Sequence, residues 1–194
     1  MADALIVVDV QNDFCPGGAL AVPLGNEVVP VLNEYIRRAR TASMPIFASR
    51  DWHPAATKHF AAQGGPWPPH CIQGTWGAEF NPYLELPGEA QVVSKGTDTE
   101  DDGYSAFEAR LPEGGQTLRE ALRALGVTRV HIGGLATDYC VKATVLDALS
   151  EGLETHVLTD ASRPVDVRPG DGDRALRLML DGGAAPETIT EFHP

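Results

Sequence analysis

Reactive side chains stand at the ends of four strand-like apolar runs in this chain. Asp9 closes ALIVVD, Asp51 and His53 follow the run PIFASR, Lys95 closes QVVSK, and Cys140 comes shortly after VHIGGLA. Open parallel sheets bind ligands outside the carboxyl ends of their strands. If these strands are parallel neighbours, a carboxylate, an ammonium, a thiol and metal-type ligands share one cleft. We therefore interpret the chain as an enzyme.

Cys140 is the best candidate for a nucleophile. With Thr137 or Asp138 as the N-cap, Cys140 falls in the first turn of a helix. At that position the macrodipole and the free N–H groups favour a thiolate, and a nearby Lys95 ammonium would lower the pKa of the thiol further. Asp9 could take the thiol proton and later return it to a leaving group. These parts suit acyl transfer through a thioester that water hydrolyses.

The backbone before the thiol suits a developing oxyanion. Free amides at a helix N-terminus can stabilise such a charge, and Gly133, Gly134 and Ala136 keep the approach open. Taken singly, each reactive group also has a plainer explanation. An Asp at a strand end often caps a helix or turn, a lone Lys is usually solvated, and a lone Cys usually packs. Four such groups at successive strand ends are much harder to explain in that way.

A second set of residues has the composition of a metal site. Asp51 and His53 form an Asp-x-His pair on an extended segment, and His59 and His70 follow within seventeen residues. Carboxylate and imidazole ligands suit zinc, the first candidate, or iron(II) or manganese, with water in the open positions. The alternative is a group of surface histidines in a polar loop.

The remaining cysteines and histidines lack such surroundings. Cys15 and Cys71 are expected to pack in the interior, and so is His131, which alternates within a strand-like run. His156 and His193 are expected at the surface.

Aromatic residues could wall the cleft. Phe14, Trp67 and Tyr104 lie near the reactive motifs in the sequence, and flat apolar walls suit an aromatic substrate. The alternative is local packing of the long segment 54–88, which is too long to be an ordinary connection in a compact domain. Its aromatic content argues against disorder. The second irregular segment, 163–172, is expected to be an exposed loop without chemistry.

Composition limits the classes of function. The chain has 194 residues, of which 43% are hydrophobic, and its net charge is −12. The negative charge argues against a nucleic-acid surface, and the longest apolar runs are far shorter than a membrane span. We see no signal peptide at the N-terminus, and three cysteines cannot all pair internally. We expect a cytoplasmic protein with reduced thiols.

Strand-like and helix-like stretches alternate, which predicts a parallel sheet covered on both faces. We expect a single domain, 1–194, of the α/β class: a three-layer α/β/α sandwich with a mostly parallel sheet of about six strands. The predicted strands are Ala4–Val10, Pro45–Arg50, Glu89–Ser94, Arg129–Leu135, Leu153–Thr159 and Thr188–Thr190, and the predicted helices are Glu27–Ala42, Thr117–Leu125, Tyr139–Ser150 and Asp171–Leu180.

Several motifs together resemble a known family. The stretches are DVQNDF at 9–14, DWH at 51–53, WPPHCIQGTWGAEF at 67–80, SKG at 94–96, DGYSAF at 102–107 and GLATDYCV at 134–141. In this order they resemble the nicotinamidases, or pyrazinamidases, of the isochorismatase-like cysteine hydrolase superfamily. The WPPHC stretch and the Asp-x-His pair are the narrower signals. The segment 54–66 departs from the family by being rich in Ala and Gly.

The resemblance implies a role for each matching residue. It implies a triad of Asp9, Lys95 and Cys140. It implies that a metal is held by Asp51, His53 and His70, with His59 as an additional ligand in some members. Oxyanion amides would come from Ala136 and Cys140, with a cis peptide between Leu135 and Ala136. The candidate substrate-binding residues are Phe14, Trp67, Tyr104, Leu135 and Ala136.

The implied reaction is hydrolysis of nicotinamide to nicotinate and ammonia in NAD salvage, with pyrazinamide as a second substrate. In the family the metal holds the pyridine nitrogen. The partner is thus a small molecule, and a homo-oligomer is compatible with the sequence. The competing hypotheses are a superfamily amidohydrolase for carbamoyl or ureido substrates and a catalytically silent metal-binding domain. Isochorismatase activity is disfavoured, because vinyl-ether hydrolysis does not need Cys140.

Overall fold

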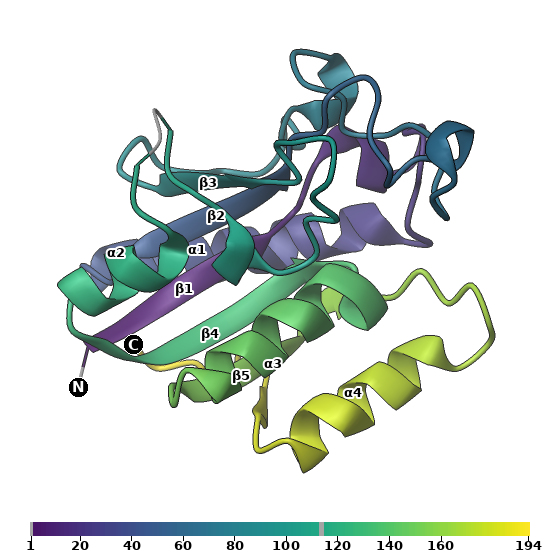
Figure 1. Cartoon of the computed structure of the whole chain (residues 1–194). Coiled ribbons are helices and arrows are strands. Elements are labelled where there is room, and N and C mark those ends of the chain that lie inside the picture. The colour runs from purple at the N-terminus through teal and green to yellow at the C-terminus, as the bar shows by residue number, and fades with distance from the viewer. Residues whose placement is uncertain (1, 113–114) are drawn as a thin grey trace.

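The computed structural model describes residues 2–112 and 115–194. Within these residues the strands form one six-stranded sheet of order β3-β2-β1-β4-β5-β6, in which every neighbouring pair is parallel. The predicted α/β class and the mostly parallel sheet are confirmed (Figure 1). The strands are β1 (Ala2–Val8), β2 (Ile46–Asp51), β3 (Gln91–Lys95), β4 (Val127–Leu135), β5 (Glu154–Arg163) and β6 (Ala185–Glu187).

The apolar residues of β1 do not alternate with polar ones because both of its faces are buried. Leu5 and Val7 pack into one hydrophobic core, and Ile6 and Val8 into the core on the opposite face. Burial of such side chains contributes about 25 cal/mol per Å² of apolar area. The centre of the sheet is thus the stable base from which the polar strand ends project.

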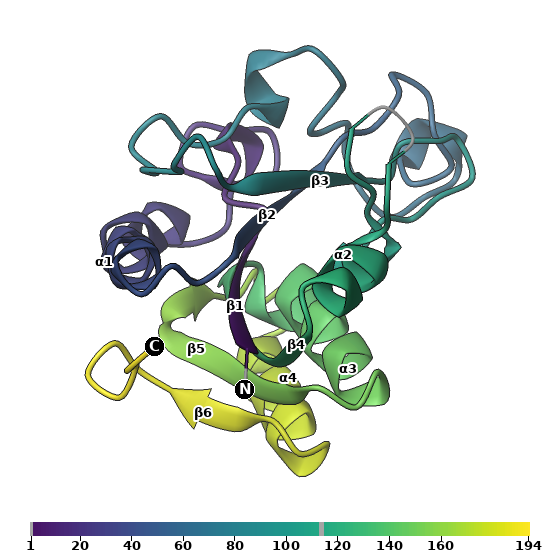
Figure 2. The ribbon, with the colours of Figure 1, turned by 90° about the vertical axis from the view of Figure 1, so that its left-hand side faces the viewer.

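Helices cover both faces of the sheet, as a three-layer sandwich requires. In Figure 2, α1 (Val28–Thr41) lies on one side, and α2 (Leu118–Ala124), α3 (Lys142–Ser150) and α4 (Asp171–Asp181) lie on the other. The buried side chains of α1 include Leu32, Tyr35 and Ile36, which recur at helical spacing. Among the described residues, no helix is both long and apolar enough to cross a membrane.

The long segment 54–88 lies beyond the carboxyl ends of β1, β2 and β3 (Figure 1). It consists of short turns, such as Ala61–Gln63 and Trp76–Ala78. The bridge Phe60–Trp67 is internal to the segment, and the bridge His53–Ile72 joins it to the end of β2. Backbone hydrogen bonds from His53 N to the Cys71 carbonyl (3.0 Å) and from Gln73 N to the His53 carbonyl (2.8 Å) fix it against the end of β2.

Two predicted elements are wrong in position. The last strand is Ala185–Glu187 rather than Thr188–Thr190, because the Glu191 carboxylate accepts hydrogen bonds from the backbone and hydroxyl of Thr188 and closes a turn there. A strand that contains Pro186 is tolerated at the sheet edge. The helix predicted to begin at Tyr139 begins as α3 at Lys142, after a wide helical turn over Thr137–Val141.

Candidate active site

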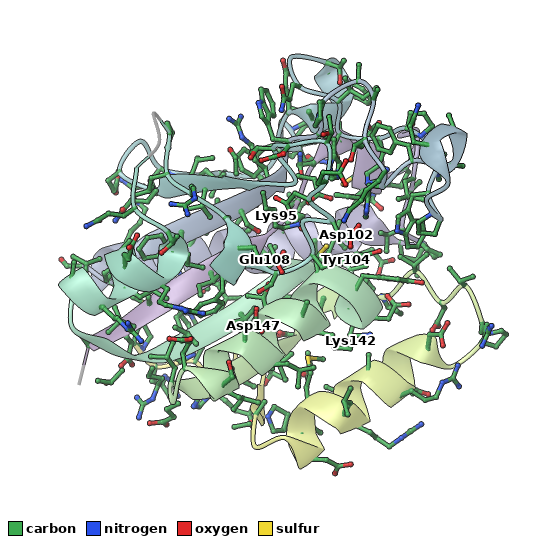
Figure 3. The ribbon with its side chains drawn as sticks, in the orientation of Figure 1. Lys95, Asp102, Tyr104, Glu108, Lys142 and Asp147 are labelled. Atoms are coloured by element: carbon green, nitrogen blue, oxygen red, sulfur yellow. The ribbon has the colours of Figure 1, made fainter. Side chains whose placement is uncertain are left out.

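The ammonium group of Lys95 is the centre of a buried polar cluster. Its Nζ lies 2.7 Å from Asp9 Oδ2 and 3.5 Å from Cys140 Sγ, and it donates to the Gly103 carbonyl at 2.6 Å. It also pairs directly with Asp51 Oδ1. Lys95 is only 1% exposed. The three residues of the predicted triad therefore lie within mutual reach, between β3 and the turn into α3 (Figure 3 labels Lys95).

Sheet register and one unusual backbone conformation place these groups. Lys95 and Asp51 are register partners at the ends of β3 and β2, so their side chains leave the sheet side by side. Asp9 follows β1 with a left-handed backbone (φ 49°), which is uncommon for a residue with a Cβ and is often found at functional sites. Its carboxylate accepts from Ser49 Oγ at 2.7 Å.

The buried charges shift one another's pKa values. Burial raises the pKa of Asp9 to about 6, against the opposing effect of the Lys95 ammonium. Burial alone would lower the pKa of Lys95, but the Asp51 and Asp9 carboxylates hold it well above its usual range. Burial alone would raise the pKa of Asp51, but the Lys95 ammonium holds it below its usual range. Lys95 and Asp51 are thus a fixed ion pair beside an Asp9 whose pKa is raised above its usual range.

The environment of Cys140 differs from the prediction in two respects. Burial raises the pKa of the thiol well above its usual range, the Lys95 ammonium lowers it, and Asp9 and Asp51 raise it further. Lys95 thus acts in the expected direction, but the prediction that the pKa of the thiol is low is wrong, because burial and the two carboxylates outweigh Lys95. Neither Thr137 nor Asp138 caps the helical turn: the Asp138 carboxylate instead accepts from the backbone N–H groups of residues 165 and 166, at 2.8 and 2.9 Å.

Three histidines gather next to this cluster. Ligand atoms of His53, His59 and His70 all lie within 4.8 Å of one another. Asp51 Oδ2 lies 3.6 Å from His53 Nε2 and 3.8 Å from His70 Nε2. All four residues are buried, so the alternative of surface histidines is wrong. His59 belongs to the same group, since one of its ring nitrogens lies within 4.8 Å of a ring nitrogen of both His53 and His70.

The donor set fits a divalent metal. His53 Nδ1 contacts the Gly96 carbonyl at 3.1 Å, and His70 Nδ1 contacts the Pro68 carbonyl at 2.8 Å. A carbonyl only accepts, so Nδ1 carries the hydrogen and Nε2 keeps its lone pair for a ligand. Within residues 2–112 and 115–194, His53 Nε2 has no hydrogen-bond partner, and neither has His59 Nδ1. Burial lowers the pKa of His59 to about 4 and also lowers that of His70, which favours the neutral, ligating imidazole.

A small cavity opens above the thiol. Of the predicted substrate-binding residues, Phe14, Trp67, Tyr104 and Ala136 line it. Trp67 Nε1 donates to the Tyr104 hydroxyl at 2.9 Å, which joins two of its walls. Leu135 is absent from the described lining and packs in the core instead. The peptide bond between Leu135 and Ala136 is cis, as expected. The remaining lining residues are Leu20, Val22, Asp51, His59, His70, Tyr139, Cys140 and Val165.

The sequence was compared with models of known protein families. The model of the isochorismatase domain matches residues 3–191. The chain belongs to the isochorismatase family.

Three relatives of this isochorismatase domain are similar over most of their length. The nicotinamidase of Escherichia coli (strain K12) is 40% identical over 204 residues, covering 97% of this chain and 96% of the relative. The pyrazinamidase of Pyrococcus horikoshii, solved in complex with zinc, has a TM-score of 0.89 and 46% identity, with 97% and 99% of the two chains covered. PnC1 from L. infantum, solved in complex with nicotinate, has a TM-score of 0.85 and 33% identity, with 98% and 94% covered.

Two polar residues of the isochorismatase domain were not identified from the sequence as part of the site. The Gln11 side chain donates to the Asp51 carbonyl at 2.8 Å and accepts from the Asp51 N–H at 2.8 Å. The Asp13 carboxylate accepts from the Cys71 N–H at 2.7 Å, next to His70. Both residues lie in the DVQNDF motif and are buried. The signal in the sequence is that Asp9, Gln11 and Asp13 occupy alternate positions of one short motif, which indicates that all three point toward the same site.

The remaining cysteines and His131 are buried, as expected. Cys71 lies next to the histidine group, since its carbonyl accepts from His53 N at 3.0 Å. His193 is exposed, whereas His156 is only partly exposed. The segment 163–172 is not merely an exposed loop, because Val165 lines the cavity.

Proposed function

We propose that this protein is a metal-dependent cysteine amidohydrolase that converts nicotinamide to nicotinate and ammonia, with pyrazinamide as a second substrate. The observation that carries the proposal is the contact of Lys95 with both Asp9 and Cys140, beside three histidines and under an aromatic-walled cavity. A role in NAD salvage follows from this substrate. The names of the relatives support the same reaction.

Asp9 begins the proposed reaction by taking the proton of the Cys140 thiol. A ligand atom of each lies within 4.8 Å of the other, and the Asp9 pKa of about 6 suits a group that accepts and returns a proton near neutral pH. Cys140 Sγ then attacks the carboxamide carbon. Asp9 returns the proton to the amide nitrogen as the C–N bond breaks, and ammonia leaves. Water hydrolyses the thioester to the carboxylic acid and regenerates the thiol.

Lys95 and the backbone would stabilise the charges that appear during these steps. Lys95 Nζ, 3.5 Å from Cys140 Sγ, stabilises the thiolate as it forms. The amides of Ala136 and Cys140, both residues of the cavity lining, are proposed to donate to the oxyanion of the tetrahedral intermediate. Each such donor contributes roughly 3–4 kcal/mol in related chemistry.

A divalent metal, zinc first, is proposed to be held by Asp51, His53 and His70, with His59 as a further ligand. Among the described residues, His53 Nε2 and His59 Nδ1 have no hydrogen-bond partner, although Asp102 Oδ1 lies 3.7 Å from His59 Nδ1, and this supports the set. When bound, the ion would offer a Lewis-acid contact to the ring nitrogen of the substrate. Iron(II) or manganese would satisfy the same donors. Phe14 and Trp67 would hold the ring from its two sides, because both line the cavity above Cys140.

The direct test is ammonia release from nicotinamide by wild type and by two alanine variants. Cys140→Ala should lose kcat/KM by roughly 10³-fold or more, because the nucleophile is removed. Cys15→Ala, which removes a buried cysteine outside the cavity lining, should keep kcat/KM within a few fold. Wild-type turnover in Cys140→Ala would overturn the mechanism. If the wild-type enzyme prefers an N-carbamoyl or ureido compound to nicotinamide, the proposed substrate is wrong and the alternative amidohydrolase class is favoured.

A further inference from the structure

A second cluster of histidine and carboxylate groups lies across three strands at the other edge of the sheet. His131 of β4 and His156 of β5 are register partners, and Ala185 of β6 is the next residue in the same row. Glu187 follows two residues later and therefore points to the same face of the sheet. One ligand atom from each of His131, His156 and Glu187 lies within 4.8 Å of the others. Figure 2 shows β6 at this edge, beside β5.

The two histidines converge on one carboxylate. His131 Nδ1 lies 2.6 Å from Glu187 Oε2, and His156 Nδ1 lies 3.4 Å from Glu187 Oε1. Glu187 is 5% exposed and His131 is 4% exposed. In the described part of the chain, no Lys or Arg forms an ion pair with Glu187. A buried carboxylate needs a positive partner, because an unpaired buried charge is costly.

The far nitrogen of each histidine faces another carboxylate. His131 Nε2 lies 3.7 Å from Asp3 Oδ2, and His156 Nε2 lies 3.3 Å from Glu154 Oε1. His131 Nε2 has no hydrogen-bond partner among the described residues. The His156 contact is a hydrogen bond, whereas the His131 contact must shorten to become one. An ion on the Nδ1 side of both rings would leave each Nε2–H to donate to its carboxylate, as in a carboxylate–histidine–metal triad.

The balance of charge also favours a cation. Asp3, Glu154 and Glu187 carry three negative charges around the two histidines, and Arg129 pairs with Asp3 and Glu154 to supply one positive charge. With neutral histidines the group therefore has a net charge of −2. One divalent ion neutralises that charge.

We propose that His131, His156 and Glu187 form a second divalent metal site, of the zinc type, away from the active site. In a tetrahedral zinc site with bonds near 2.0–2.1 Å, ligand atoms lie about 3.3 Å apart. The contact between His156 and Glu187 already has this spacing, and the contact between His131 and Glu187 must open by less than ~1 Å to reach it. The ligand Nδ1 atoms leave Nε2–H free to donate to Asp3 and Glu154.

The place of this site in the fold indicates a structural role. β6 is a three-residue edge strand, and an ion shared by Glu187, His131 and His156 ties it to β4 and β5. The chain after β6 returns over the same site, where the Phe192 ring packs on His131 with centroids 4.9 Å apart. The His156 side chain is 21% exposed, which leaves a route for the ion.

The test counts metal. Chains loaded with zinc and then dialysed are analysed for zinc per chain, in wild type, in Glu187→Gln and in the double variant His53→Ala/His70→Ala. We expect two equivalents in wild type and one in each variant, with nicotinamide turnover retained in Glu187→Gln. The matched control is Glu85→Gln, an exposed carboxylate in the segment 54–88, which should keep both equivalents.

A second measurement guards against misfolding of Glu187→Gln. Cobalt(II) added to the His53→Ala/His70→Ala variant should give the absorption bands of a tetrahedral site, and these should disappear when His156→Ala is added. A simple His–Glu pair without a metal predicts neither result. Zinc that is lost entirely with His53 and His70, or a cobalt spectrum that is unchanged by His156→Ala, would overturn the proposal. The zinc lost in Glu187→Gln and the cobalt bands lost with His156→Ala report on the second site alone, so they test it even if the proposed function fails.

Discussion

Asp9 combines a left-handed backbone with a pKa raised by burial to about 6. Its carboxylate form must be present to accept the Cys140 proton. Below its pKa the group is protonated and cannot accept, so kcat/KM should fall as the pH falls below about 6, by about tenfold for each pH unit. The pH–rate profile with nicotinamide measures this acid limb. A profile that is flat from about pH 5 to pH 7 would contradict the role of Asp9.

The same residue can be tested by substitution. Asp9→Asn keeps the shape of the side chain but removes the base, and should lower kcat by roughly 10²–10⁴-fold. Asp98→Asn is the control, because Asp98 is exposed on the loop after β3. Equal kinetics for the two variants would show that Asp9 has no part in proton transfer.

Lys95 holds two buried carboxylates as well as facing the thiol. Lys95→Met leaves Asp9 and Asp51 without their ammonium partner, and breaking a buried pair in this way costs about 3–5 kcal/mol. The free energy of unfolding, measured by urea denaturation at pH 7, should fall by that amount, and ammonia release should be lost. Lys58→Met, at an exposed lysine, should change neither. Stability within ~1 kcal/mol of wild type in Lys95→Met would contradict the ion-pair assignment.

For individual residues, the sequence was sufficient to predict which groups react but not their pKa values. The identities of Asp9, Lys95 and Cys140 followed from their places at strand ends. The pKa of Cys140 did not follow, because it depends on the burial of the thiol and on two carboxylates that approach from the ends of β1 and β2. Gln11 and Asp13 were overlooked for a related reason, since their partners are backbone groups 40 and 58 residues away.

At the scale of elements, the segment 54–88 is held to the sheet by polar contacts from the residues after β1. Asp13 accepts from both Cys71 N and Ala19 N. Asp13→Ala leaves these amides unpaired and frees the residue next to His70. We expect zinc affinity, measured by competition with a chelator, to fall by roughly 10–100-fold, as for other outer-shell residues. Asp166→Ala, a change away from this segment, should leave the affinity unchanged. An unchanged zinc affinity in Asp13→Ala would show that the contacts of Asp13 with this segment do not support metal binding.

Elements with strong local patterns were predicted best. The buried strands β1 and β2 and the helix α1 appear within a few residues of their predicted bounds, because their patterns reflect burial directly. The short edge strand was misplaced because Thr188 has high strand propensity but bonds locally to Glu191. The wide turn at Thr137–Val141 has no local signal, since the Asp138 carboxylate that holds it is bonded to the backbone N–H of residue 165, 27 residues away.

At the scale of the molecule, strand order decides which residues meet. β3, β2, β1 and β4 are consecutive in the sheet, so side chains from positions 9, 51, 95 and 140 converge, although they are far apart in the chain. A local sequence pattern indicates strands but not their order in the sheet. The sequence therefore predicted that these side chains meet only if the strands are parallel neighbours. The same sheet carries His131, His156 and Glu187 toward its other edge, where they form the proposed second site.

Removal of metal should therefore destabilise the whole molecule in two separable parts. A ligand present at 100 times its Kd stabilises a fold by ~2.7 kcal/mol, and in a chain of this length each kcal/mol shifts Tm by about 2–4 °C. Chelation should then lower the Tm of wild type by roughly 5–10 °C for each site lost. In His53→Ala/His70→Ala, chelator should lower Tm only by the amount that the site on β4–β6 contributes. When Glu187→Gln is added to this variant, chelator should no longer lower Tm. Differential scanning calorimetry with and without chelator measures both shares. An equal loss of Tm in all three proteins would contradict the assignment of either cluster as a metal site, because the effect would not follow the proposed ligands.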